Sequence, residues 1–211
     1  MADNTPKPTI NEFQAFMMYA TPTNGSTRSP KLSFGIRDGK PRITVYTNVP
    51  EDSDKFYGII NAPMDAMTFT TVMTLLSDIA VGPNDTKQRI DNFTSRRQED
   101  GSYGDKILLS STMIGKDASG IVWISVISDD DTRPKIKFEF TLSDYHKLVK
   151  SDGTPYSKAE ASVLVTRGLT ENLPKMIMPF MSGFSAKGNA RPTNNQSSGN
   201  NTFTLSEDIP Y

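Results

Sequence analysis

The sequence predicts an α+β fold of two ββββα repeats built on antiparallel β-hairpins. Three observations lead to this prediction. A β-hairpin pattern occurs twice, in residues 31–48 and again in residues 106–128. Each hairpin is followed by an acidic loop, a further strand and a helix-start signal. Asp65 and Asp144, at the two helix starts, lie about 79 positions apart, which gives the length of the repeat.

The first repeat covers about residues 11–82. Apolar and polar residues alternate on both sides of Asp38-Gly39, a dipeptide typical of hairpin turns. Asp65 precedes apolar residues at helical spacing, and Gly82-Pro83 ends that pattern. The expected elements are a strand at 13–20, a hairpin at 31–48, a strand at 56–61 and a helix that opens at 63–65.

The second repeat covers about residues 86–184. Its expected elements are strands at 87–95, 106–114, 121–128 and 135–140, and a helix that opens at Leu142-Ser143-Asp144, with Ser143 as N-cap and with Tyr145, Leu148 and Val149 on one face. A further helix is expected after Ser157, because Ser157 and Glu160 have the spacing of a capping box. This helix is expected to bury Ala161, Leu164, Val165 and Leu169, and Pro174 is expected to kink or end it.

The repeat order and the segment KIKFEFTLSDYHKLV (135–149) resemble the Whirly and PC4-like family of single-stranded-DNA-binding proteins. The resemblance is one of pattern and covers about 140 residues. It implies a curved sheet with a helix behind it and nucleic acid along the exposed strands. The Lys-Gly-Asn-Lys-type motif of plant Whirly proteins is absent, so no DNA contact is transferred residue by residue. An OB-fold barrel is the alternative, although it has five strands and usually one helix.

Basic and aromatic residues lie on the faces of the expected strands. Arg42, Thr44 and Tyr46 alternate with Ile43 and Val45, so the two sets are expected on opposite faces. A sequence-tolerant binder of single strands needs cations for the phosphates and rings on which bases stack. The expected nucleic-acid-binding residues are Arg37, Lys40, Arg42, Tyr46, Lys87, Arg89, Arg96, Arg97, Lys135 and Lys137.

The chain divides into a binding domain at 1–184 and a tail at 185–211. Residues 185–204 are rich in Asn, Ser and Gly, which predicts a disordered coil with a reach of ~25 Å r.m.s.. The end of the chain resembles the acidic tip of bacterial single-stranded-DNA-binding proteins, an acidic run followed by Ile-Pro-Phe. The resemblance implies that a partner protein is bound by Glu207, Asp208, Ile209, Pro210 and Tyr211.

Composition excludes several classes of protein. The chain has 211 residues, a net charge of −1 and no cysteine, so it forms neither disulfides nor thiolate metal sites. No apolar run approaches the ~20 residues of a membrane span, and the N-terminal MADNTPKPT is not a secretory signal. His146 is the single histidine, and Walker, Rossmann and kinase motifs are absent. We therefore expect a cytoplasmic protein, in the host cytoplasm if it is phage-encoded, with no enzymatic activity and no cofactor.

The expected function is non-catalytic binding of single-stranded DNA in replication, recombination or repair. The basic strand faces would bind the DNA, and the C-terminal tip would recruit replication or recombination proteins. The alternatives are a transcription-modulating or protein-interaction module of a phage, and a structural phage protein. A homo-oligomer stays open, as do the DNA site size and the preference between DNA and RNA.

Overall fold

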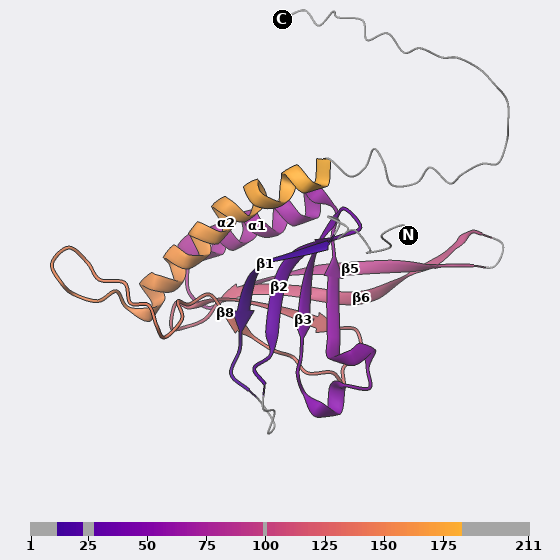
Figure 1. The fold of residues 1–211 in the computed structure, drawn as a ribbon, viewed down its shortest axis with the longest axis horizontal. Helices are drawn as coiled ribbons and strands as arrows, with labels where there is room; N and C mark the ends of the chain where they lie inside the picture. The colour runs from indigo at the N-terminus through magenta and orange to yellow at the C-terminus, as the bar shows by residue number, and fades with distance from the viewer. Residues whose placement is uncertain (1–11, 23–27, 99–100, 183–211) are drawn as a thin grey trace, which may run out of the picture.

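The computed structural model describes residues 12–22, 28–98 and 101–182. These form an α+β fold of two four-stranded antiparallel sheets and two α-helices (Figure 1). The first sheet contains β1 (Glu12–Tyr19), β2 (Lys31–Arg37), β3 (Lys40–Tyr46) and β4 (Ile59–Pro63), and α1 (Ala66–Val81) follows it. The second contains β5 (Thr86–Arg97), β6 (Tyr103–Lys116), β7 (Val122–Ser128) and β8 (Phe138–Glu139), and α2 (Lys158–Ser182) is the next helix. The described strands form no closed barrel, so the OB-fold alternative is not the architecture.

The turn between β2 and β3 has the predicted form. Asp38 and Gly39 both have positive φ, at 52° and 68°. A two-residue turn with positive φ at both positions matches the right-handed twist of the strands, and Gly and Asp tolerate it best. The turn sets the register of the hairpin, in which Arg37 pairs with Lys40 and Gly35 with Arg42.

Helix α1 begins and ends with specific hydrogen bonds. The Asp65 carboxylate accepts a hydrogen bond from the Thr68 backbone N–H at 2.7 Å, as expected of an N-cap. At the other end the Lys116 ammonium donates to the carbonyls of Ala80 and Gly82, at 3.1 and 3.0 Å. Between these ends the buried residues are Phe69, Val72, Met73, Leu76, Ile79 and Ala80, nearly the stripe that the spacing predicted.

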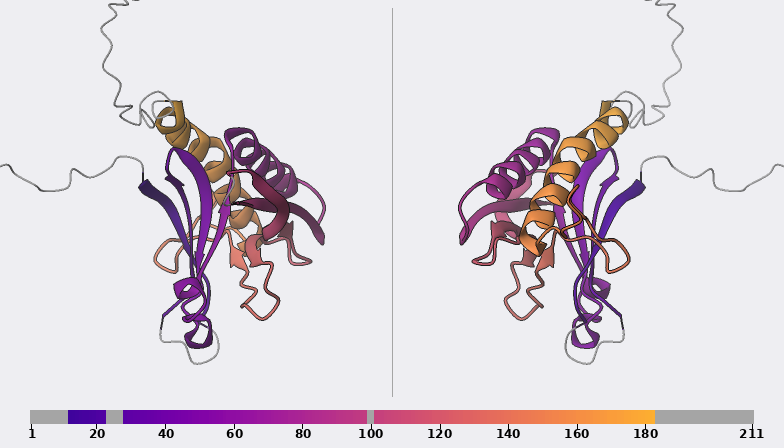
Figure 2. Two further views of the ribbon diagram at one scale, coloured as in Figure 1. Left: turned by 90° about the vertical axis from the view of Figure 1, so that its right-hand side faces the viewer. Right: turned by 90° about the vertical axis from the view of Figure 1, so that its left-hand side faces the viewer.

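Both sheets and both helices share one hydrophobic core. Its strand residues include Leu32, Phe34, Ile43 and Val45 from the first sheet and Ile114, Val122, Ile124 and Phe138 from the second. The helices α1 and α2 pack side by side, as the turned views in Figure 2 show. Because the inner faces of the sheets meet in this core, their outer faces point to solvent in different directions.

The helix predicted to open at Leu142-Ser143-Asp144 is wrong. Residues 141–157 form a loop, with one β-bridge between Val149 and Pro155. Ser143 does not cap a helix, and its Oγ lies 2.8 Å from Nδ1 of His146. Tyr145 and Val149 are exposed, at 95% and 52%. The segment is short, and a helix of fewer than ~12–15 residues is marginal in water without tertiary packing of an apolar face.

The helix of the second repeat is α2, which begins after Ser157 as the capping box predicted. It runs through Pro174 to Ser182, and the burial of Leu173 and Ile177 on either side of the proline offsets the lost backbone hydrogen bond. Leu164 was expected in the core but is 42% exposed. Ser162 is buried instead, and its Oγ accepts a hydrogen bond from the Val122 N–H at 2.9 Å.

The β5–β6 hairpin extends beyond the helices as a long arm (Figure 1), along which Phe93 and Tyr103 are exposed. The last strand, β8, covers only part of the predicted 135–140. Within the described ranges, no helix is both long enough and apolar enough to cross a lipid bilayer.

Candidate nucleic-acid interface

The outer face of the first sheet carries aromatic and polar side chains in cross-strand rows. Tyr19 on β1, Lys31 on β2, Tyr46 on β3 and Ile59 on β4 are neighbours in register, and we call them the tyrosine row. Their sequence neighbours Leu32, Val45 and Ile60 are buried in the core. The tyrosine row therefore faces outward, because successive side chains alternate between the two faces of a sheet.

A hollow of about 360 Å³ lies on this outer face. Its lining residues are Gln14, Ser33, Gly35, Ile36, Arg37, Arg42, Thr44, Tyr46, Ile59 and Asn61. None of these described lining residues is acidic, whereas Arg37 and Arg42 are cations. Both Ser33 and Gly35 are small and buried, which leaves room for the hollow between the larger side chains.

Tyr46 is held in a defined orientation beside the hollow. The Gln14 Nε2 donates a hydrogen bond to the Tyr46 hydroxyl at 2.7 Å. The Lys31 ammonium lies 4.4 Å from the centre of the ring, at cation–π distance. The predicted face is confirmed for Arg42, Thr44 and Tyr46, and the arrangement places an oriented aromatic ring next to positive charge.

The outer face of the second sheet has its own aromatic–basic cluster. The Trp123 indole lies against Gly115, where an added Cβ would come within 2.6 Å of the ring. The Lys137 ammonium is 5.8 Å from the Trp123 ring centre. Lys87 and Arg89 lie on this same face, in register with Gly115 and Met113.

Several cations of the second repeat are paired with carboxylates. Arg89 contacts Asp91 at 2.5 Å, Lys137 contacts Asp117 at 2.9 Å, and Lys135 contacts Asp131 at 3.0 Å. Hydrogen bonds from Arg89 and Ser111 hold the pKa of Asp91 below its ordinary value. These carboxylates offset part of the positive charge of the second repeat.

The predicted binding residues therefore do not share one face. Arg37, Lys40, Arg42 and Tyr46 lie on the first sheet, while Lys87 and Arg89 lie on the second. Lys135 and Lys137 lie just before β8, in a groove at the sheet edge. The side chains of Arg96 and Arg97, and the tip residues 207–211, lie outside the described residues. The alternation of side chains between the two faces of each strand was predictable. The placement of the two sheets relative to each other was not, because the core between them sets it.

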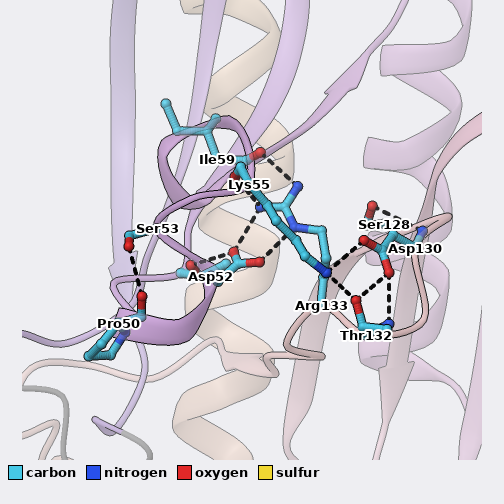
Figure 3. A network of polar contacts seen from close by, with 10 residues as sticks. Pro50, Asp52, Ser53, Lys55, Ile59, Ser128, Asp130, Thr132 and Arg133 are labelled. Carbon is cyan, nitrogen blue, oxygen red and sulfur yellow. Dashed lines mark hydrogen bonds and ion pairs between the residues drawn. The ribbon is translucent and has the colours of Figure 1, made fainter.

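The acidic loops of the two repeats are joined by a buried ion pair (Figure 3). Arg133 donates from Nε and Nη2 to the two carboxylate oxygens of Asp52, both at 2.8 Å. The Thr47 hydroxyl donates to the same carboxylate at 2.8 Å. Burial raises the pKa of Asp52, but the hydrogen bonds from Arg133 and Thr47 outweigh it and leave that pKa below its ordinary value. Lys55 adds a second link, to Asp130 at 2.9 Å.

This network holds an unusual turn that the sequence did not indicate. Arg133 also donates to the backbone carbonyls of Lys55 and Ile59, at 3.3 and 3.1 Å, on either side of Phe56 and Tyr57. Both aromatic residues have positive φ, at 49° and 57°, a conformation that costs ~1–2 kcal/mol for each residue with a side chain. Their side chains are 81% and 92% exposed. Residues 56–61 had been predicted as a strand, and only 59–61 belong to one.

Comparison with known proteins assigns this chain to no family. No family model, curated protein or solved structure matches this chain. Within the described ranges, no group of three His, Cys, Asp or Glu side chains is placed to hold a metal ion. The function is therefore argued from the geometry of the surfaces above.

Proposed function

We propose that this protein is a non-catalytic single-stranded-DNA-binding protein that acts in DNA replication, recombination or repair. The observation that carries the proposal is the hollow on the first sheet, where Arg37, Arg42 and the oriented ring of Tyr46 meet with no acidic residue among the described lining. The order and packing of the two repeats support a Whirly/PC4-like arrangement, in which exposed strands carry the nucleic acid.

The mechanism combines charge and stacking. Arg37 and Arg42, together with the exposed Lys40 at the β2–β3 turn, attract the phosphates. Tyr46 offers a ring on which a base stacks, and stacking accepts any base because every base has a π-face. Duplex DNA hides its bases inside the helix, so only a single strand makes both kinds of contact. This mechanism needs no cofactor.

The C-terminal tip completes the proposal. Glu207 to Tyr211 would bind replication or recombination proteins through the aromatic ring of Tyr211 and the two acids Glu207 and Asp208. The tail would let the tip search for partners while the domain stays on DNA. A phage-encoded protein acting in the host cytoplasm fits this combination, and self-association on DNA is compatible with it.

The direct test measures affinity for oligo-dT and for duplex DNA of equal length at several salt concentrations. We expect preference for the single strand, and a log–log salt slope of about −0.7 per neutralised phosphate. Tyr46→Ala should weaken binding by ~1–3 kcal/mol without changing the slope. Lys40→Ala should weaken binding and flatten the slope by up to ~1 unit.

Tyr46→Phe is the matched control, because it keeps the ring and removes only the hydroxyl that accepts from Gln14. It should bind oligo-dT nearly as the unmodified protein does. Equal affinity for duplex and single strand, or binding that ignores salt, would contradict the proposal. Normal binding by Tyr46→Ala with a lowered melting temperature would assign the ring to stability instead.

A protein-interaction module is the second candidate function, favoured by the Phe56–Tyr57 turn. Two exposed aromatic side chains on a strained, well-held backbone are typical of an interaction surface. The exposed acids Glu51 and Asp54 beside them favour a basic protein segment over DNA. If this function is the main one, Phe56→Ala and Tyr57→Ala will leave the fold intact, and the unmodified protein will show no salt-dependent affinity for oligo-dT.

A further inference from the structure

We infer that a bound single strand leaves the first sheet over Tyr19 and continues into a groove at the sheet edge, so that this groove is a second part of the DNA site. The inference rests on the proposed function. It adds to that function the path of the bound DNA strand and the residues that contact the DNA beyond the first sheet. It concerns the space between β1, β8 and the loop at residues 141–157, which we call the edge groove.

The edge groove is the larger of the two candidate DNA surfaces. It has a volume of about 1100 Å³, against about 360 Å³ for the hollow. Its described lining includes four lysines, Lys135, Lys137, Lys147 and Lys158, but only two carboxylates, Glu139 and Asp144. Tyr19, Tyr156 and His146 also line it and supply rings. A basic groove with aromatic side chains is what a sequence-tolerant binder of single strands requires.

Lys147 is the cation in the groove that is best placed to bind phosphate. Lys135, Lys137 and Lys158 are each paired with a carboxylate, at 3.0, 2.9 and 2.8 Å. Lys147 is exposed and makes no ion pair or hydrogen bond with any residue that the structure describes. Its charge is therefore not offset locally, and a phosphate that binds it displaces no existing contact.

The tyrosine row connects the hollow to this groove. Tyr46 lines the hollow, and Tyr19 lines the groove. The two residues are in register through Lys31, two strands apart, which is ~10 Å at a strand spacing of ~4.8 Å. Tyr19 is 63% exposed, so its ring is available to a base between the two sites.

Charge decides at which end of the tyrosine row the bound DNA strand leaves the first sheet. At the Ile59 end lie Phe56 and Tyr57, with the exposed acids Glu51 and Asp54 beside them. These acids repel a polyanion. At the Tyr19 end lies the edge groove, where Lys147 makes no ion pair with a described residue and the carboxylate of Glu139 is paired with Lys158. The path over Tyr19 is therefore the favourable one, although both ends offer aromatic rings.

The test compares two charge reversals on a length series of oligo-dT, from about 6 to about 30 nucleotides. Lys147→Glu lies in the edge groove. Lys175→Glu is the matched control, because Lys175 is also exposed but lies ~21 Å further along α2 than Ala161, which lines the groove. Thermal melting of both variants checks that they are folded.

We expect Lys147→Glu to bind the longest oligonucleotide about tenfold more weakly, and the shortest one that binds with nearly unchanged affinity. Lys175→Glu should change neither by more than about twofold. Tyr19→Ser should show the same length-dependent loss as Lys147→Glu, with less effect on the salt slope. Together these results would show that the groove holds the part of the strand beyond the first sheet.

Equal losses for Lys147→Glu and Lys175→Glu would overturn the inference, because they would reflect overall charge and not a site. A Lys147→Glu variant that binds every length normally would also overturn it, while the proposed function would stand if Tyr46→Ala still weakened binding. Absence of salt-dependent binding by the unmodified protein at all lengths would overturn both.

Discussion

Arg133 and Asp52 show how a single pair of residues ties the two repeats together. They lie 81 positions apart, and their side chains are 5% and 2% exposed. A buried ion pair loses hydration, and here two hydrogen bonds between the partners, one from Thr47 and two to backbone carbonyls compensate for that loss. The pair holds the turn at Phe56 and Tyr57 against the loop that precedes β8.

Arg133→Ala should lower the free energy of unfolding by ~3–5 kcal/mol, because it leaves the Asp52 carboxylate buried without its partner. Denaturant unfolding followed by circular dichroism measures this change. Lys135→Ala is the control: it removes an exposed ion pair two residues away and should cost less than ~1 kcal/mol. Equal effects of the two substitutions would mean that the buried pair contributes no more than a surface pair.

At the scale of elements, the start of α2 is a small network built from neighbouring residues. Glu160 accepts hydrogen bonds from the Ser157 N–H and hydroxyl, both at 2.8 Å, and the Ser157 Oγ accepts from the Glu160 N–H at 3.2 Å. Lys150, in the preceding loop, donates to Glu160 at 2.8 Å. The bond from Lys150, followed by those from Ser157, lowers the pKa of Glu160 to about 2. The same contact with Glu160 raises the pKa of Lys150.

Glu160→Gln should therefore lower the melting temperature at neutral pH, because Gln keeps the capping geometry but loses the charge. A carboxylate with a lowered pKa stabilises the fold above its unfolded value near 4.5, and that contribution is lost as the pH falls toward about 2. The difference in melting temperature between the two proteins should accordingly close between pH 4.5 and pH 2.

Glu171→Gln is the control for this experiment, since Glu171 forms an exposed pair with Lys175 later on the same helix. It should change the melting temperature little at any pH. A gap between Glu160→Gln and the unmodified protein that stays constant down to pH 2 would show that the carboxylate charge does not stabilise this helix start.

At the scale of the whole molecule, we propose that the domain and the tail have separate roles. The domain carries the hollow and the edge groove, and the tip at residues 207–211 is proposed to bind partners. We propose that the acids of the tip, Glu207 and Asp208, would compete with DNA phosphates for the cations of the domain.

Deletion of residues 205–211 should leave the melting temperature unchanged and preserve or tighten the affinity for oligo-dT. The deletion should abolish binding to the replication protein that the tip is proposed to bind. Tyr211→Ala should remove most of the same binding. Oligo-dT titration and partner pull-down with purified replication proteins measure the two effects. A truncated protein that unfolds, or that loses DNA binding while keeping its partners, would assign the tail a structural role.

The local features of this fold were predictable from the sequence. The Asp38-Gly39 turn, the Asp65 cap, the Ser157–Glu160 capping box and the outward row of Arg42, Thr44 and Tyr46 each depend on residues a few positions apart. Their geometry follows from steric and hydrogen-bonding rules that act within one turn or one strand. The order of the eight strands followed from these local patterns, but the helix expected to open at 142–144 did not form.

Tertiary structure alone decided what lies far apart in the sequence. Nothing local distinguishes Asp52, which is buried against Arg133, from the exposed Asp54 two residues later. The segment at 142–149 has a helical pattern but remains a loop, because a stretch this short is marginal as a helix without tertiary packing. Likewise, the cations predicted to bind nucleic acid lie on two sheets that point in different directions, since the sheets pack by their inner sides. The sequence by itself determined the faces of each strand, and the shared core determined where those faces point, because burial of apolar surface acts on the whole chain at once.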